Sequence, residues 1–285
     1  MDMKQHLNEI LYVALLGMAF TFFAFVSITT VFAQTRETRN VETFTKLSFR
    51  VPGKLFLRQG STQKVELEGA KDVLAEVDTE VSDGKLVIGH DGGRWLDWHW
   101  DNDEKVNVYI TVKDLKAIAV AGSGDLIAET KFNATDLELT VSGSGSLKMD
   151  ADASGMMDIN VSGSGNIDLT GKCADFASRV SGSGKIVSHV TIGNRAEFNV
   201  SGSGKIIASG TAKRVKTSIS GSGRVQAADL VTNTCDVRIS GSGDVVIEVR
   251  DELEANITGS GSVTYKGSPS KINSHASGSG KVRKM

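Results

Sequence analysis

Proline and cysteine are scarce in this sequence, with 2 residues of each among 285. The sequence also has no large excess of either charge, because its 32 lysines and arginines nearly balance its 34 aspartates and glutamates. This balance argues against an electrostatic nucleic-acid-binding protein, which needs a surplus of cations for the phosphates.

Glycine is the residue in excess, with 31 of 285 positions, or about 11% against a usual share of about 7%. It does not recur at every third position, which excludes collagen. The hydrophobic share of 40% excludes a disordered glycine-rich linker. The glycines therefore indicate a folded, β-rich protein.

Residues 1–33 have the features of an export signal. A short polar start with Lys4 precedes an apolar run from Ile10 to Val31, and the residues up to Ala33 fit the small-residue cleavage pattern. The alternative is an uncleaved membrane anchor, because about 20 apolar residues can span a bilayer. Either way, the sequence predicts a protein exported to the periplasm, the cell envelope or the outside of the cell.

The most regular feature is the tripeptide Gly-Ser-Gly, which occurs nine times at intervals of 18 to 21 residues. Around each copy, apolar and polar residues alternate with the two-residue period of a strand. Counted from the first glycine, positions −2 and +4 are apolar in every repeat. We interpret the glycines of these motifs as structural turn residues: Gly122, Gly124, Gly143, Gly145, Gly163, Gly165, Gly182, Gly184, Gly202, Gly204, Gly221, Gly223, Gly241, Gly243, Gly259, Gly261, Gly278 and Gly280.

A unit of about 20 residues with two short strands cannot bury its apolar side alone, so its columns must stack on those of the next unit. The sequence therefore predicts an all-β fold, a single-stranded right-handed parallel β-helix. The hand follows from the strong preference of parallel crossovers. The turn glycines would form a ladder along one edge, where a side chain would meet its counterpart about 4.8 Å away. Whether one coil holds one Gly-Ser-Gly motif or two stays open.

The predicted organisation has three parts, which are an export signal at 1–33, an N-terminal β region with capping and early coils at 34–115, and regular coils at 116–285. Two further expectations concern the middle part.

Val81 to Leu86 resembles a degenerate repeat, because Gly84 lies 38 residues, or about two coils, before Gly122. The segment from Thr43 to Glu68 is then expected to close the first coil, since an exposed solenoid end invites edge-to-edge aggregation.

The repeated Val-Ser-Gly-Ser-Gly, followed by a charged and an aliphatic residue, resembles the head GIN domain family of putative auto-transporter adhesins. Lys54 to Gly60 and Val263 to Pro269 resemble this family too, so the likeness covers about residues 40–283. The resemblance implies a β-helix related in shape to pectin lyases, without their catalytic residues, and a role in cell adhesion.

Neither a cofactor nor a metal is expected. Glycine motifs flanked by strands lack the helix N-terminus that phosphate-binding loops use, and no histidine lies at metal-ligand spacing from a carboxylate or a cysteine. Cys173 and Cys235 are about three coils apart, roughly 14 Å along the axis. A disulfide allows about 7 Å between Cα atoms, so they are not expected to pair.

No enzyme activity is expected either. Polysaccharide-cleaving β-helices use aspartates or an arginine gathered on one sheet face. Here, position +3 of adjacent repeats changes from Asp125 to Ser146 and then Asn166. Further along, the same position carries Lys185, Lys205 and Arg224, which form a basic stripe. The stripe is either a solvated face or a strip that meets anionic glycans or a neighbouring chain.

All three tryptophans, Trp95, Trp98 and Trp100, lie within six residues of one another, beside Asp97 and Asp101. Flat aromatic surfaces flanked by carboxylates suit stacking on sugar rings, so these five residues are the candidate ligand-binding site. The alternative is a loop folded over the solenoid, with the indoles filling its groove.

The sequence thus predicts an exported, non-catalytic β-helix, an adhesin or scaffold that binds a polysaccharide or protein partner at the bacterial envelope. The expected partner is a glycan or an envelope protein, not a nucleic acid, and the membrane only through an uncleaved N-terminal segment. Two alternatives remain, which are a carbohydrate-active enzyme of pectin-lyase-like shape and a purely structural periplasmic rod.

Overall fold

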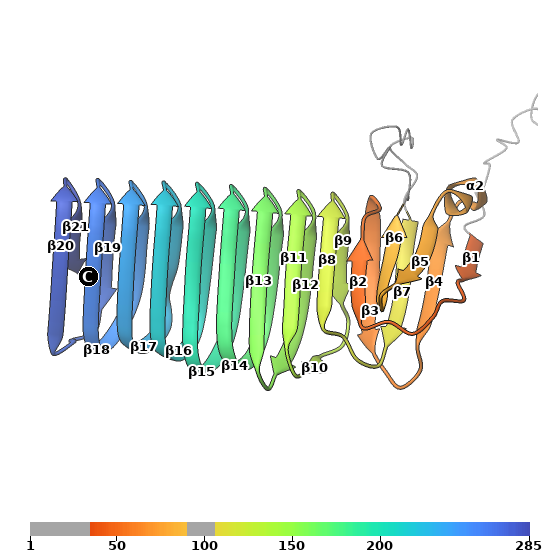
Figure 1. The fold of residues 1–285 in the computed structure, drawn as a ribbon, viewed down its shortest axis with the longest axis horizontal. Coiled ribbons are helices and arrows are strands. Elements are labelled where there is room, and N and C mark those ends of the chain that lie inside the picture. Colours follow the sequence, from red (N-terminus) through yellow and green to blue (C-terminus); the bar gives the residue numbers. More distant parts are fainter. Residues whose placement is uncertain (1–34, 90–105) are drawn as a thin grey trace, which may run out of the picture. The chain divides into compact units, whose positions relative to one another are not determined.

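A computed structural model describes residues 35–89 and 106–285, and within them the chain consists almost entirely of β-strands (Figure 1). The described residues form a compact unit of their own. The predicted export signal, residues 1–33, lies outside the described residues. In the part of the chain that the structure describes, no helix has the length and apolar character needed to cross a membrane.

The strands fall into an irregular N-terminal group and a regular series. The N-terminal group comprises β1 (Thr35–Thr38), β2 (Lys46–Phe49), β3 (Gly53–Gln59), β4 (Lys64–Gly69), the helix α2 (Lys71–Ala75), β5 (Asp78–Ser82), β6 (Lys85–Gly89) and β7 (Val106–Val112). The regular series comprises β8 (Ala117–Gly122), β9 (Asp125–Ala128), β10 (Phe132–Ala134), β11 (Leu137–Gly143), β12 (Ser146–Ala153), β13 (Met156–Gly163), β14 (Asn166–Gly182), β15 (Lys185–Gly202), β16 (Lys205–Gly221), β17 (Arg224–Gly241), β18 (Asp244–Gly259), β19 (Ser262–Lys266), β20 (Lys271–Gly278) and β21 (Lys281–Lys284).

The regular strands stack into two parallel ladders. In the incoming ladder, strands run into the glycine turn, and β11 pairs with β8 and β13 so that Gly143 lies opposite Gly122 and Gly163. In the outgoing ladder, strands leave the turn, and β12 pairs with β9 and β14. The long strands from β14 to β18 contribute one half to each ladder. One coil therefore holds one Gly-Ser-Gly motif, and the predicted all-β solenoid is confirmed, whereas its handedness stays a prediction.

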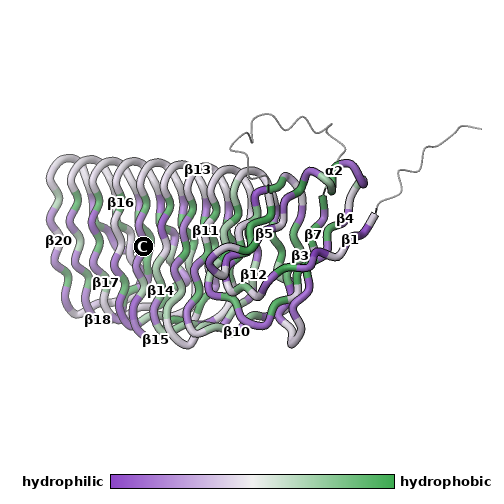
Figure 2. The backbone as a smooth tube through the Cα atoms, turned by 45° about the vertical axis from the view of Figure 1, so that its right-hand side comes forward, coloured by the Kyte–Doolittle hydropathy of each residue, from purple (hydrophilic) through white to green (hydrophobic). Residues whose placement is uncertain are grey.

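The apolar columns predicted from the sequence line the interior. At position −2, Val141 lies opposite Val120 and Val161, and all three are buried. At position +4, Leu147 lies in the same way between Leu126 and Ile167. Figure 2 shows the alternation of hydrophobic and hydrophilic residues repeating from coil to coil. The core is therefore a stack of matching columns.

Large and small residues complement each other inside this core. Phe176 lies opposite Ala196, and Ser178 lies opposite Phe198, so the two rings meet edge to face with centroids 6.3 Å apart. Thr217 lies on the other side of Phe198. The hydroxyls of Ser178 and Thr217 are fully buried and have no hydrogen-bond partner among the residues that the structure describes. The small residues therefore make room for the ring, and their hydroxyls are desolvated without compensation.

The two glycines of each motif are required for different reasons. Gly202 adopts a φ of 107°, and a Cβ there would lie 2.8 Å from the carbonyl oxygen of Gly182. That oxygen accepts the N–H of Ser203 at 3.0 Å, so it must stay accessible. A Cβ on the second glycine, Gly204, would instead clash with Val180 Cγ1 in the core column. The first glycine protects a hydrogen bond between coils, and the second leaves space for position −2.

The N-terminal strands pair with other partners than the sequence predicted. β2 pairs in parallel with both β6 and β8, and β3 pairs in parallel with both β7 and β9. Residues 46–59 thus form an inner coil, and the expectation that Thr43 to Glu68 closes the solenoid is wrong for this part. The parallel stacking ends instead where β4 pairs antiparallel with β7 and β1, and β5 antiparallel with β6.

Gly84 does not belong to a degenerate repeat. Ser82 pairs with Lys85 across a two-residue turn in which Asp83 and Gly84 have φ values of 50° and 68°. Positive φ at both positions is the type I′ hairpin turn that Asp-Gly favours. The spacing of two coils between Gly84 and Gly122 is therefore a coincidence.

We predict that Gly202→Ala lowers the free energy of unfolding by about 2–5 kcal/mol, because the side chain combines strained backbone with overpacking. Gly193→Ala is the matched control, since its Cβ would lie 3.6 Å from Ala174 Cα, an ordinary contact. Denaturant unfolding of both variants measures the difference. Equal stabilities would show that the glycine ladder is not closely packed.

We predict that Thr217→Val raises the free energy of unfolding by about 1–3 kcal/mol, because valine keeps the volume and removes the unpaired buried hydroxyl. Thr211→Val, at an exposed position, is expected to change stability by less than about 0.5 kcal/mol. Thermal unfolding compares the two, and a destabilised Thr217→Val would mean that the hydroxyl has a partner in solution.

Candidate functional site

The register that stacks the core also arranges the outward side chains in rows. Lys185 lies opposite Lys205 in the outgoing ladder, and Lys205 lies opposite Arg224. Facing residues of neighbouring parallel strands are about 4.8 Å apart. The basic stripe predicted from the sequence is therefore a continuous row of three cations.

The coils that carry this stripe are more basic than the stripe alone indicates. Residues 185–224 contain seven lysines and arginines and one acidic residue, Glu197. Four of these cations lie outside the stripe. Two of the four, Arg195 and Arg214, lie opposite each other where β15 and β16 pass from the outgoing to the incoming ladder. A charge count along the sequence would have found this concentration, which the comparison of single repeat positions missed. The four are Arg195, Lys213, Arg214 and Lys216.

Most of these cations lack a counter-ion. Of the seven, Arg224 alone has a carboxylate within ion-pair distance among the residues that the structure describes, with Asp244 at 3.4 Å. Both partners are substantially exposed, so this pair contributes little to stability. The remaining positive charge faces solvent.

The surface beside the stripe is apolar and hydroxyl-bearing. Val187 and Ile207 lie opposite each other and are half-buried. Two residues further along the strands, His189 Nδ1 and Ser209 Oγ are 2.6 Å apart. We define the basic face as the stripe together with these outward residues of β15 and β16: Lys185, Val187, His189, Lys205, Ile207, Ser209 and Arg224.

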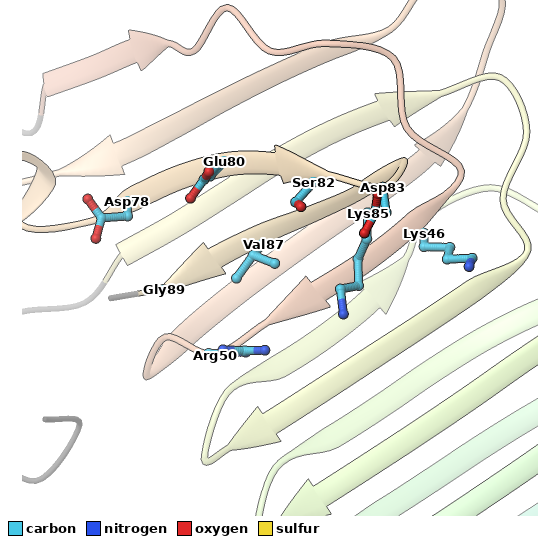
Figure 3. Close-up of a pocket in the computed structure, with 9 residues that line it drawn as sticks. All are labelled: Lys46, Arg50, Asp78, Glu80, Ser82, Asp83, Lys85, Val87 and Gly89. Carbon is cyan, nitrogen blue, oxygen red and sulfur yellow. The ribbon is translucent and has the colours of Figure 1, made fainter. Parts of the chain in front are cut away.

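A second feature is a hollow of about 440 Å³ on the outer face of β2, β5 and β6 (Figure 3). Acidic side chains project from β5 and its turn, and basic side chains come from β2, from Arg50 directly after β2, and from β6, which also contributes Val87. Small-molecule sites are predominantly apolar, whereas charges of both signs line this hollow. It suits a ligand or a neighbour that carries both charges. Its charged lining residues are Lys46, Arg50, Asp78, Glu80, Asp83 and Lys85.

An aromatic stack lies on the outer face of the N-terminal coils. The rings of Phe56 and Tyr109 are parallel within 16°, with centroids 5.2 Å apart, and Arg36 Cζ lies 4.0 Å from the Tyr109 centroid. Burial, followed by the hydrogen bond with Glu68, raises the pKa of Tyr109. Arg36 and Phe56 come from strands on opposite sides of β7, so both faces of the tyrosine ring are covered. The stack therefore supports the fold and offers no free tyrosine face to a sugar.

The predicted tryptophan site lies outside the described residues. Trp95, Trp98 and Trp100, with Asp97 and Asp101, belong to the connection between the end of β6 at Gly89 and the start of β7 at Val106. β6 pairs beside β2, and β7 beside β3. The site is thus placed in the chain between an incoming and an outgoing strand, and its role in binding glycans stays a prediction.

Two carboxylates on the outer rows, Asp125 and Asp152, serve structural roles. Asp125 accepts a hydrogen bond from Ser146 at 2.5 Å. Burial alone would raise the pKa of Asp152, but hydrogen bonds from Lys131 and Lys172 lower it below its usual value. Within residues 35–89 and 106–285, no group of three histidines, cysteines or carboxylates is placed to hold a metal ion.

The cysteines are free thiols, as predicted, and both are buried. Burial, with a smaller contribution from Asp175, raises the pKa of Cys173 to about 12. Burial also raises the pKa of Cys235. Because the thiolate is the reactive form, neither residue is suited to nucleophilic or redox chemistry at neutral pH.

We predict that a thiol reagent such as DTNB does not label either cysteine of the folded protein at pH 8, because both thiols are protonated and inaccessible. In denaturant, where a thiol has a pKa of about 8.5, both cysteines should react quickly. Absorbance of the released thiolate counts the labelled sites. Fast labelling of the folded protein would contradict the burial of these side chains.

The sequence profile of a family described as "Putative auto-transporter adhesin, head GIN domain" matches residues 43–206 and 189–269. Among curated proteins there is no match.

Several solved bacterial structures share the fold. A putative lipid binding protein from Parabacteroides distasonis is 23% identical, with a TM-score of 0.67 over 88% of this chain and 96% of that one. A putative adhesin from Parabacteroides merdae is 21% identical, with a TM-score of 0.66 over 88% and 96% of the two chains. A putative adhesin from Parabacteroides distasonis is 23% identical, with a TM-score of 0.66 over 88% and 97%. At these identities, the likeness shows the fold alone.

Proposed function

From the premise that the chain belongs to the head GIN domain family of putative auto-transporter adhesins, we propose that it is an exported, non-catalytic adhesin or scaffold. Its partner is a polysaccharide or a protein at the bacterial envelope. The family assignment supports an adhesive role. The surface of the solenoid supports binding of a polysaccharide or a protein.

The observation that carries the proposal is the regularity of the outer faces. At position −1 of the incoming ladder, Ser142, Ser162 and Ser181 lie directly opposite one another, and the row continues with Ser201 and Ser220. Each of these five coils thus repeats the same polar group at the strand spacing of about 4.8 Å. Such a surface can make many similar contacts with a repeating polymer, which is how solenoids use their extended faces.

The outer carboxylates argue for binding without cleavage. Polysaccharide hydrolysis requires a pair of carboxyl groups that flank the scissile bond. Asp125 and Asp244, at position +3 of two distant coils, are each hydrogen-bonded to the serine of the next coil, Ser146 and Ser262. Asp158 is similarly held by Arg179 at 2.6 Å. These acids hold neighbouring coils together.

We expect the protein to bind selected members of a glycan array or an envelope protein and to leave every bound glycan intact. The tryptophan segment is tested by the combined change of Trp95, Trp98 and Trp100 to alanine, with folding checked by circular dichroism. Binding lost in the folded variant would assign recognition to this segment. Retained binding would indicate that the ligand binds to the faces of the solenoid instead.

The enzyme alternative is tested by incubating the bound glycans and assaying new reducing ends. Turnover that disappears when Asp97 and Asp101 are changed to asparagine would contradict a non-catalytic role. Absence of any glycan or protein partner would contradict adhesion and favour a purely structural rod.

A further inference from the structure

We propose that the basic face binds a single chain of an anionic polysaccharide that lies along β15 and β16, with one of its acidic groups on the stripe of Lys185, Lys205 and Arg224. This inference rests on the proposed adhesive function and adds to it the ligand class and the surface that recognises it.

The charge of the basic face is unfavourable in the isolated protein. Lys185, Lys205 and Arg224 face one another directly across neighbouring strands, and like charges in that position destabilise a sheet. Lys185 and Lys205 have no ion-pair partner in the part of the chain that the structure describes, and Arg224 has only Asp244. A bound polyanion would relieve this repulsion and release its own counter-ions.

The rest of the face suits sugar rings. Val187 and Ile207 adjoin the stripe in the same strands and present a half-buried apolar row, against which the C–H face of a pyranose can pack. His189 and Ser209 follow two residues later and supply hydrogen-bonding groups for hydroxyls. A polymer of acidic sugars therefore matches charge, apolar contact and hydrogen bonding together, whereas a bare polyphosphate matches only the charge.

Cations also stand at the far end of the same strand halves. Arg195, Lys213 and Arg214 are exposed where β15 and β16 turn toward the incoming ladder. Lys205 and Lys213 are eight residues apart, which corresponds to about 26 Å of extended strand. A polysaccharide laid along β15 and β16 thus meets cations at both ends and the apolar row between them.

Acidic residues limit the basic face on both sides and favour a single strand over a planar surface. Asp168 lies opposite Val187 in the preceding coil, and Asp244 lies opposite Arg224 in the following coil. An anionic membrane pressed against this side would also meet these carboxylates, whereas one polymer strand fits between them.

The test measures binding of polygalacturonate, a polymer of carboxylated sugars, to the full-length protein by biolayer interferometry at low and high salt. The stripe variant combines Lys185→Gln, Lys205→Gln and Arg224→Gln. The matched control combines Lys54→Gln, Lys113→Gln and Lys116→Gln, which removes the same charge from exposed positions elsewhere.

We expect the stripe variant to lose at least tenfold in affinity and to depend less on salt, because fewer counter-ions are released. The control should stay within about twofold of the original protein at the same salt concentration, since screening weakens charges that lie far from the ligand. Asp244→Asn should bind more tightly than the original protein, because it removes a repulsive carboxylate and frees Arg224. Neutral dextran should bind to none of these proteins.

The proposal is overturned if the stripe variant and the control lose affinity equally, since net charge alone would then explain binding. It is also overturned if the original protein binds no polygalacturonate, or if anionic vesicles or DNA bind through the same three residues more tightly than the polysaccharide does. Binding of another array glycan or a protein with the stripe variant unimpaired would overturn this inference and leave the adhesive function standing. A protein that binds none of the array ligands would overturn both.

Discussion

The structure depends on the close approach of each glycine turn to the one before it. The carbonyl oxygen of Gly163 accepts the N–H groups of both Ser183 and Gly184, each at 2.9 Å. A Cβ on Gly182 would lie 2.7 Å from the same oxygen, so this bond exists only where the facing residue has no side chain. The bond aligns the two coils at their turn, and the ladders on either side continue that alignment.

One register therefore serves both the interior and the surface. Inside, it places each residue of positions −2 and +4 over an apolar equivalent, which leaves little freedom for substitution. Outside, the same register makes rows whose members do not pack in the core, so their chemistry can differ from coil to coil. The stripe of Lys185, Lys205 and Arg224 and the charged hollow near β5 are two such differences, at different places along one scaffold.

The parts of the fold that the sequence predicts are those that repeat locally. The spacing of Gly-Ser-Gly and the columns at positions −2 and +4 specify the coil, because each unit must bury its apolar side against the next. The place of β2 and β3 between later strands could not be predicted, because pairing between distant segments depends on the packing of the whole and leaves no local pattern. The hairpin at Asp83 and Gly84 did carry a local pattern, and a coincidental spacing concealed it. The concentration of cations between residues 185 and 224 was predicted only in part, since Arg195 and Arg214, which lie beyond the basic face, do not occupy repeat position +3.

Amide hydrogen exchange at the serines of the glycine turns tests the central claim most directly. The N–H groups of Ser183, Ser203 and Ser222 donate to glycine carbonyls of the preceding coil at 2.9 to 3.0 Å. If these bonds hold the coils in register, the exposed turn serines should exchange as slowly as the neighbouring strand amides, since they open only when a coil separates from the next. Exchange at the rate of a solvent-exposed loop, with the strands still protected, would show that the solenoid is held by its core alone.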